Sequence, residues 1–231
     1  MGRAVTGNEL VAAFPKVYHM AHQDSWPSIH EHGLLSTSAL LHLFEIVGEE
    51  RRAIEAAHRR DSVKIVHPVH GRAVIRDQKP MSDKKLASCL TNGMTPASWY
   101  RELNRRVFFW ATRERLQCMV DARAYRSDPQ IVLTINTRRL VDQYEDQIEV
   151  TTINTGSTAY QAQARGPDTF VPLAEFDYDK SRRKRGRRKA IAEIVVNDTV
   201  PDVTDLIVLA ERWIGGDPSS VIWQATVGTA P

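Results

Sequence analysis

The sequence predicts a mixed α/β (α+β) fold, a β core surrounded by helices, in a single domain over residues 1–231. Two observations indicate this class. A hydrophobic share of 42% is enough to bury one core in a chain of 231 residues. Short aliphatic or aromatic runs typical of strands also alternate along the chain with segments of helical spacing.

The first hundred residues are expected to contain mainly short helices. In chain order, the expected elements are a helix at Asn8–Phe14, a strand at Val17–Met20, a two-turn helix closed by Gly33, one or two helices within Ser38–Arg60, a strand at Val63–Val66, and helices at Met81–Leu90 and Ala97–Asn104. Thr6 or Asn8 can cap the first helix, because side-chain oxygens accept from its free N–H groups. Asp24 or Ser25 can cap the two-turn helix in the same way, and Pro27 fits its first turn.

The second half is expected to supply most of the strands. In chain order, these elements are a strand at Val107–Ala111, a helix at Arg113–Tyr125, a strand at Ile131–Ile135, a helix at Thr137–Tyr144, strands at Ile148–Ile153, Ala190–Val196 and Val203–Leu209, and a helix at Ala210–Ile214. Val107–Ala111 is rich in aromatic residues, which favour strands, and Thr112 is a good cap for the helix that follows. Ile148–Ile153 alternates with period two, as a half-buried strand does.

Cysteine usage and hydropathy exclude several classes of protein. Cys89 and Cys118 lack a CxxC neighbour and zinc-ligand spacing, so we expect two reduced thiols and neither a disulfide framework nor a zinc finger. The sequence contains no run of about 18 apolar residues, and residues 1–7 lack the apolar stretch of a secretory signal. A soluble, cytoplasmic protein with no membrane partner is therefore expected.

One segment concentrates the positive charge. The formal net charge is only +3, but residues 182–189 hold seven cations in eight positions. The seven are Arg182, Arg183, Lys184, Arg185, Arg187, Arg188 and Lys189. Such a block cannot be buried, so it is either a solvated loop or a surface that binds phosphates.

Two side chains are unusual in their surroundings. Glu193 is the one carboxylate within the apolar run Ala190–Val196. It either faces solvent from one side of the sheet or points into a cleft, where a fixed anion can stabilise a developing cation. His19 is either a structural hydrogen-bonding residue or, at an accessible strand end, a contact for a ligand hydroxyl.

Metal, redox and nucleotide-triphosphatase chemistry find little support in the sequence. Three close histidine pairs occur, at His19/His22, His30/His32 and His67/His70. None of them has a third ligand at motif spacing, so no metal site is expected. Neither the G-x-G-x-x-G pattern nor the Walker pattern is present.

Three blocks of the chain resemble a known family and follow its order. The first is Tyr18-His-Met-Ala-His-Gln-Asp-Ser-Trp-Pro27 with Gly33-Leu-Leu-Ser36, the second is Phe108-Phe-Trp-Ala-Thr-Arg113, and the third is Lys189-Ala-Ile-Ala-Glu193-Ile-Val-Val with Val200-Pro-Asp202. Together they resemble the DarT toxins, bacterial ADP-ribosyltransferases that use NAD to modify DNA bases. The blocks define a core over roughly residues 15–210, within which 49–95 is a family-divergent insertion.

The resemblance implies an ADP-ribosyltransferase-like fold, a split and mostly antiparallel β core with an NAD cleft between its halves. It also implies that Glu193 is the catalytic glutamate, Arg113 the active-site arginine and His19 a contact of the NAD adenosine ribose. NAD is then consumed as a substrate, and the residues expected to contact it are Tyr18, His19, Ser25, Ser36, Phe108, Phe109 and Trp110.

The chain departs from the family pattern at several positions. Ala21 and Ser25 stand where the family usually has Thr and Asn, so the NAD contacts of that loop are expected to be rebuilt. The arginine block lacks its usual flanking prolines, which leaves Arg105 or Arg106 as possible substitutes for Arg113. The divergent segment 49–95 is expected to shape the acceptor surface.

The chemistry of the reaction fits these residue types. Breaking the bond between nicotinamide and ribose generates an oxocarbenium-like sugar, which an anion stabilises, and Glu193 supplies that anion. A carboxylate can also take a proton from the attacking base nitrogen. Arg113 suits the pyrophosphate because its fork donates two parallel bonds, and the run Phe108–Trp110 offers a flat apolar pocket for nicotinamide.

The sequence therefore predicts transfer of ADP-ribose from NAD to a base of DNA or RNA. A single-stranded acceptor is expected, because the base must be exposed to reach a sugar held in a cleft. The basic run 182–189 would contact its phosphates. Two alternatives remain open: transfer to a protein or a small molecule, and a non-catalytic nucleic-acid-binding module on the same fold. A toxin or phage-defence role would imply an antitoxin partner, by resemblance alone.

Overall fold

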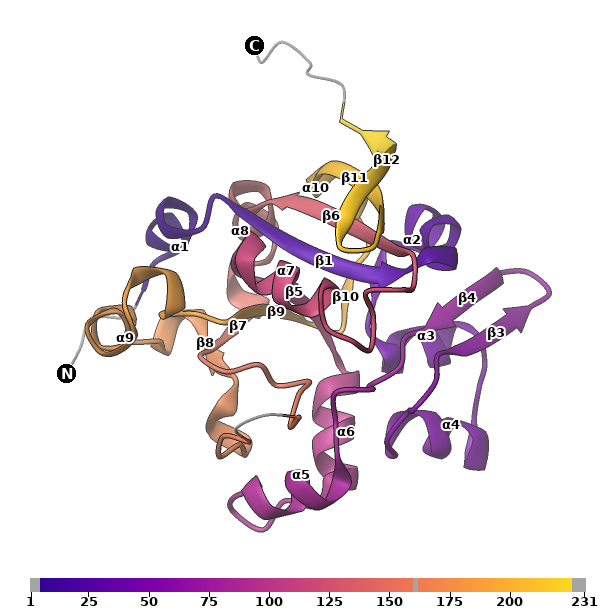
Figure 1. Ribbon diagram of the computed structural model, residues 1–231, viewed down its shortest axis with the longest axis horizontal. Coiled ribbons are helices and arrows are strands. Elements are labelled where there is room, and N and C mark those ends of the chain that lie inside the picture. The colour runs from indigo at the N-terminus through magenta and orange to yellow at the C-terminus, as the bar shows by residue number, and fades with distance from the viewer. Residues whose placement is uncertain (1–4, 160–161, 226–231) are drawn as a thin grey trace.

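The computed structural model describes residues 5–159 and 162–225, and in this part of the chain one large antiparallel sheet forms the centre of the molecule (Figure 1). Its strands, in order across the sheet, are β12 (Asp217–Gln224), β11 (Ile207–Ile214), β6 (Gln130–Asn136), β1 (Lys16–His22), β5 (Arg106–Trp110), β9 (Glu193–Asn197), β7 (Ile148–Thr151) and β8 (Val171–Pro172). The predicted mixed α/β class, with helices around a large antiparallel β core, is confirmed.

The sheet is divided at its centre, between β1 and β5. β1 pairs with β6 over seven residues, and β5 pairs with β9 over five. By contrast, β1 and β5, both fully described, share one register pair, Tyr18 with Trp110. The strands β12-β11-β6-β1 and β5-β9-β7-β8 therefore form two halves that meet at one point.

Helices cover both faces of this sheet. One face carries α1 (Gly7–Ala13), α2 (Trp26–His32), α8 (Thr137–Tyr144) and α10 (Val203–Leu206), whose apolar side chains join the main core. The other face carries α7 (Arg113–Val120) over one half, and α5 (Asp83–Cys89) with α6 (Pro96–Asn104) over the other. Burial from both sides explains why β6 and β9 are almost continuously apolar.

Residues 37–75 form a smaller unit beside the sheet, at the right of Figure 1. It consists of α3 (Thr37–Leu43), α4 (Gly48–Glu55) and a hairpin of β3 (Val63–His67) and β4 (Gly71–Ile75). An apolar cluster of its own holds it together, with members from all four elements. Most of the unit falls in the segment predicted to be a divergent insertion, and β4 leads the chain back to the sheet.

A two-stranded ladder connects the loops after α2 and β9. β2 (Leu34–Leu35) pairs with β10 (Thr199–Val200). Gly33, just before it, has φ +81°, and a Cβ on this residue would lie 2.5 Å from the Cα of Pro201. Both the backbone conformation and the lack of space require glycine here.

The prediction for the C-terminal segment is correct for residues 207–209, which lie in a strand, and wrong on either side of them. Residues 203–206 form helix α10 instead of a strand, and residues 210–214 belong to strand β11 instead of a helix. β11 pairs with β6 on one side and β12 on the other, so sheet pairing outweighs the local helical pattern. β12, which the sequence left without structure, follows a turn at Gly215 and Gly216, both with positive φ.

The basic run is helical instead of forming a loop. α9 (Tyr178–Arg185) is capped by Asp177, whose side chain accepts from the N–H of Lys180. The helix ends at Gly186, and a 3₁₀ turn, Arg187–Lys189, follows. The cations of its last turn lie where a helix dipole favours positive charge.

The predicted helix caps are confirmed in part. Thr6 forms a capping box with Glu9 at the start of α1, and Thr112 caps α7, which ends at Val120 instead of Tyr125. Ser25 makes no side-chain cap, because its own backbone is already helical, with φ −84° and ψ −15°. The 3₁₀ turn before it is capped by Nδ1 of His22, which accepts from the N–H of Asp24.

Two further properties follow from the described residues. Cys89 is buried and Cys118 exposed, and both are free thiols, as predicted. No helix in the described part of the chain is long and apolar enough to cross a lipid bilayer.

Candidate active site

A cavity of about 290 Å³ lies where β1 and β5 separate. Its walls come from these two strands, from β2 and β4, and from the loop 154–156. The predicted site residues that border it are His19, Ser25, Ser36, Phe108, Phe109, Trp110 and Glu193. Segments that are far apart in the sequence therefore meet at the point where the sheet divides.

His19 bridges the two halves of the sheet with its side chain. Its Nδ1 lies 2.8 Å from the carbonyl oxygen of Phe108 on β5. Because a carbonyl can only accept, Nδ1 carries the proton and donates it. Burial lowers the pKa of His19 to about 4, so its ring is neutral at pH 7. Nε2 is then left as a hydrogen-bond acceptor on a residue that lines the cavity.

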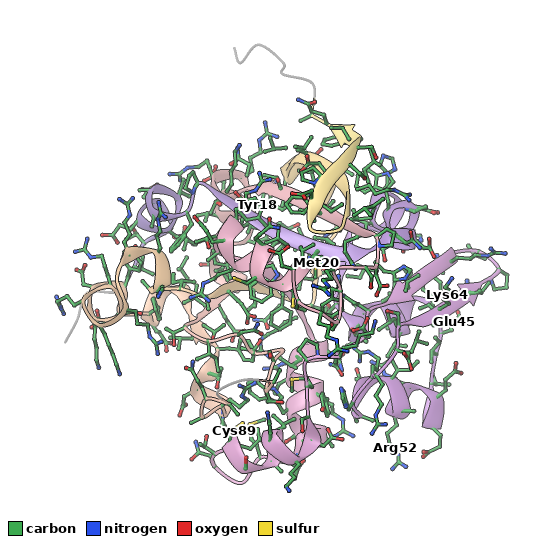
Figure 2. All side chains as sticks on the ribbon, viewed as in Figure 1. Tyr18, Met20, Glu45, Arg52, Lys64 and Cys89 are labelled. Carbon is green, nitrogen blue, oxygen red and sulfur yellow. The ribbon has the colours of Figure 1, made fainter. Side chains whose placement is uncertain are left out.

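Arg76, which follows β4, satisfies a backbone group that the divided sheet leaves unpaired. Its Nη1 donates to the carbonyl of Met20 at 3.1 Å; Met20 is labelled on β1 in Figure 2. Its guanidinium lies over the ring of Tyr125, 4.6 Å from the centroid. Its Nε is buried and has no hydrogen-bond partner among the described residues. Arg76 therefore brings a partly unsatisfied cation to the cavity wall.

Arg59 and Arg76 are two further arginines that line the cavity. Arg59 is 8% exposed and donates to the carbonyls of Ile54 and Arg76 and to Oδ1 of Asn104. Burial lowers the pKa of both arginines, that of Arg59 to about 10. Neither forms a salt bridge with any residue that the structure describes. The carboxylate of Asp77 also lines the cavity and acts to raise both pKa values, so the two cations share one nearby carboxylate, and an anionic ligand would supply further negative charge.

Arg105 and Arg106, the substitutes considered for Arg113, bind carboxylates of the protein instead. Nε of Arg106 donates to Glu149 at 2.7 Å and its Nη1 to Glu102 at 2.8 Å. Arg105 pairs with Glu102 as well. Arg106 borders the cavity, but two carboxylates neutralise its charge, so it is not available to a pyrophosphate.

Glu193 points into the cavity instead of facing solvent. It is 4% exposed and is the register partner of Trp110 on β5. Thr155 donates to its Oε2 twice, from Oγ1 at 2.7 Å and from the backbone N–H at 3.2 Å. Burial raises the pKa of Glu193 to about 7, although the bonds from Thr155 and the charges of Arg115 and Arg165 act to lower it. This carboxylate therefore titrates near neutral pH.

Arg165 fixes the loop that carries Thr155. It is 2% exposed, and its Nη1 and Nη2 donate to the carbonyls of Thr155 and Ser157 at 2.9 and 3.1 Å. Its own backbone N–H donates to the carbonyl of Cys89. Glu193 is thus oriented by Thr155, and Thr155 is in turn held by Arg165.

The aromatic strand β5 presents different residues on its two faces. Phe108 and Trp110 lie on the face that carries Glu193, while Phe109 packs in the main core with its edge towards His19, 6.1 Å between centroids. All three residues border the cavity, because it lies between β1 and β5 and is reached from both faces of the sheet. Phe108 and Trp110 are the aromatic rings on the side of Glu193.

Arg113 and Tyr18 lie outside this cavity. Arg113 is exposed at the start of α7, and its guanidinium lies over the ring of Trp213, 5.2 Å from the centroid. Arg113 and Tyr18 border a separate groove. The structure therefore does not bring Arg113 together with His19 and Glu193. Arg115, two residues further along α7, is the arginine of this block whose charge lowers the pKa of Glu193.

The basic run, residues 182–189, comes directly before β9, the strand that begins with Glu193. Six of its cations are exposed, and Arg185 is half-buried. Arg187 and Arg188 border the groove that also contains Arg113. Arg115 on α7 is close enough to feel the charges of both Glu193 and Arg185, so this end of the run is near Glu193 in space as well as in sequence.

A metal centre is not formed by the histidine pairs. In the residues described, no group of three or more His, Cys, Asp or Glu side chains could hold a metal ion. His67 and His70 stack on each other at 4.7 Å between centroids, and His67 contacts Glu45 at 3.6 Å. These histidines pack the hairpin against α3.

A family of unknown function, DUF7002, matches residues 15–207. The chain belongs to the DUF7002 family. A search of curated proteins found no match. The DUF7002 span begins one residue before β1 and ends at the first residue of β11, so it includes every residue that lines the cavity.

Four residues of this site were not expected from the sequence. Arg59, Arg76 and Thr155 line the cavity, and Arg165 holds the loop of Thr155. Both cavity arginines fall within 49–95, where the resemblance to the DarT toxins gives no guidance. Thr155 lies in a stretch whose small polar residues indicate only a loop. Ala73 and Ile75 are buried and alternate with less buried neighbours, a pattern that fits the strand ending just before Arg76 but indicates no role for Arg76 itself.

Proposed function

We propose that this chain is an ADP-ribosyltransferase that cleaves NAD and transfers ADP-ribose to a nucleic-acid base, releasing nicotinamide. The proposal depends on one observation: Glu193 is buried, has a pKa raised to about 7, and borders the same cavity as His19. The resemblance to the DarT toxins assigns roles to these same two residues. A sheet divided around a cavity also supports an ADP-ribosyltransferase type of fold.

NAD would be held by groups that line the cavity. Nε2 of His19 accepts from a ribose hydroxyl, since its Nδ1 already donates within the protein. Arg59 and Arg76 supply the positive charge that a pyrophosphate requires. Ser25 and Ser36 are buried at the wall and remain predicted contacts of the cofactor.

Glu193 acts at two stages of the proposed reaction. When the bond between nicotinamide and ribose breaks, its electron pair leaves with nicotinamide, and the carboxylate stabilises the positive charge on the sugar. A nitrogen of the acceptor base then bonds to that carbon and gives its proton to Glu193. A pKa near 7 suits both stages, because about half of the Glu193 side chains are ionised at pH 7 and the ionised form is still basic enough to take the proton. Phe108 and Trp110 offer a flat surface to the leaving nicotinamide.

The proposed acceptor is single-stranded DNA or RNA. The exposed cations of residues 182–189 lie directly before the strand of Glu193 and would contact phosphates. An unpaired base reaches a sugar in a cavity without the cost of leaving a duplex. A cytoplasmic location, a toxin or phage-defence role and an antitoxin partner belong to the same proposal and rest on the family resemblance.

The test is nicotinamide release from NAD, measured by chromatography for the protein and for Glu193→Gln, with and without single-stranded oligonucleotides. Loss of a preorganised electrostatic group costs on the order of 3 kcal/mol, so we expect the variant to be roughly a hundredfold slower or worse. Circular dichroism checks that both proteins are folded. Equal release by the two proteins, or none from either although NAD binds, would refute the proposal.

The same assay separates the alternative acceptors. If nicotinamide is released but neutralising residues 182–189 leaves the modification of the acceptor unchanged, the acceptor is a protein or a small molecule. If the chain binds oligonucleotides, releases no nicotinamide and is unaffected by Glu193→Ala, it is a non-catalytic binding module.

A further inference from the structure

A second hollow, the basic groove, lies on the face of the sheet that carries α7. It has a volume of about 420 Å³, and we define it by Lys16, Tyr18, Arg113, Arg187 and Arg188. These residues come from the start of β1, the first turn of α7 and the 3₁₀ turn after α9. Three segments that are distant in the sequence therefore bring four cations to one concave surface.

The charges of the basic groove are largely available to a ligand. All four cations are exposed. One acidic residue, Glu114, lines the groove in the described chain, and it lies 3.6 Å from Arg188, both being strongly exposed. Arg187 donates to a backbone carbonyl, that of Ala12. The one carboxylate offsets one of the four cations, so the groove keeps a net positive charge.

The basic groove adjoins the cavity through two aromatic residues. Tyr18 lines the groove, Trp110 lines the cavity, and these two form the register pair that joins β1 to β5. Trp110 is in turn the register partner of Glu193. Tyr18, Trp110 and Glu193 therefore follow one another on the same face of the sheet, at the spacing of neighbouring strands.

We infer that the basic groove binds the phosphates of a single-stranded nucleic acid and that Tyr18 stacks on one of its bases. Arg113 belongs to this acceptor groove and not to the NAD cavity. The inference rests on the proposed function, because it names the path by which an acceptor reaches Glu193. Cations that follow a backbone beside an accessible aromatic ring are the combination that binds single strands of any sequence.

Other polyanions fit the basic groove less well. A membrane surface is flat and would meet a concave groove poorly, whereas a single strand can follow it. An acidic peptide would use the cations but has no flat ring to stack on Tyr18, which is half-buried with its polar end near Arg113. A nucleic acid uses both the charges and the ring.

The experiment is fluorescence anisotropy with a labelled single-stranded oligonucleotide of mixed sequence, over a range of salt concentrations. Arg187→Glu/Arg188→Glu is compared with Arg52→Glu/Arg72→Glu, which makes the same change in net charge on α4 and β4, at the other side of the molecule; Arg52 is labelled in Figure 2. We expect roughly tenfold weaker binding and a smaller salt dependence for the groove variant, because each lost phosphate contact lowers the slope by about 0.7. The control should bind nearly as well as the unaltered protein.

Two further comparisons test whether a base stacks on Tyr18 and whether the groove prefers a nucleic acid to another polyanion. Tyr18→Ala should weaken binding several-fold, whereas Tyr18→Phe should retain it, because stacking needs the ring and not the hydroxyl. Polyglutamate at matched charge should fail to displace the oligonucleotide. Equal losses in the groove and control variants, equal effects of the two Tyr18 variants, or displacement by polyglutamate would overturn the inference. Nicotinamide release by the unaltered protein is a separate measurement, so failure of the groove and failure of the proposed function are distinguishable.

Discussion

Burial gives Glu193 a pKa of about 7 in the folded chain, against an ordinary value of 4.5. The folded state therefore keeps a proton that the unfolded state has released between these two pH values. The stability that this proton contributes is fully present below about pH 4.5 and is lost as the pH rises through 7. Above pH 7 the folded chain holds a buried carboxylate, which is a cost accepted at a functional site.

Glu193→Gln should remove this pH dependence. Urea unfolding at pH 5 and pH 8 should show that the variant gains stability relative to the unaltered protein by roughly 2 kcal/mol between the two pH values, because glutamine does not titrate. Other ionisable groups cancel in the comparison, since both proteins carry them. A difference that stays constant from pH 5 to pH 8 would mean that Glu193 titrates at its ordinary value.

Thr155 lowers the pKa of Glu193 and so affects the pH at which the reaction begins. Its Oγ1 and N–H both donate to the carboxylate, and a bond to the charged form lowers the pKa. In Thr155→Val the Oγ1 bond is lost without loss of volume, so the acidic limb of the pH profile of nicotinamide release should move to higher pH. Thr155→Ser keeps the oxygen and should leave the limb in place. Equal profiles for the valine and serine variants would contradict this role.

His19 combines a structural and a binding role on its two ring nitrogens. Asparagine can place an N–H near the position of Nδ1 and keep the bond to Phe108, but it offers no acceptor at the position of Nε2. We expect His19→Asn to fold normally and to bind NAD roughly tenfold more weakly by calorimetry. His19→Gln should show the reverse pattern, with lower stability and better binding. Parallel effects of the two variants on both measurements would exclude the division of roles.

At the scale of elements, the two-stranded ladder of β2 and β10 depends on one glycine, Gly33. Gly33 and Gly186 both have φ +81°, but a Cβ on Gly33 would overlap the backbone of Pro201, whereas a Cβ on Gly186 meets nothing within 4 Å. Each alanine variant incurs a backbone cost of about 1–3 kcal/mol. Gly33→Ala should lose clearly more than Gly186→Ala in urea unfolding, because the backbone of Pro201 cannot move without disturbing β10. Equal losses would show that the contact is not rigid.

Elements with a local signal were predictable from the sequence. β5 is marked by its aromatic residues and lies within one residue of its predicted bounds, and α7 is marked by Thr112 and begins at Arg113 as expected. β11 and β12 were not predictable in this way, because β11 gains its stability from pairing on both sides and β12 is a polar edge strand. The Gly215–Gly216 turn between them is a local hairpin signal that is independent of the hydrophobic period of the flanking residues.

At the scale of the whole molecule, the site was predictable only where a residue conflicts with its surroundings. Glu193 stands out as a carboxylate in an apolar strand, and the structure brings it to the same cavity as His19. Arg76 carries no such signal, because its position is set by a hairpin packed beside the sheet. Arg113 was assigned to the cavity by resemblance, but the direction of α7 turns it towards Trp213 and the basic groove.

The central claim is that Glu193 promotes transfer of ADP-ribose from NAD to a nucleic-acid base. The most direct measurement is mass spectrometry of single-stranded DNA and RNA oligonucleotides after incubation with NAD and the protein. We predict an increment of one ADP-ribose on at least one of them, absent with Glu193→Gln. Unmodified oligonucleotides in every reaction with folded, NAD-binding protein, or the same increment with the glutamine variant, would contradict the claim.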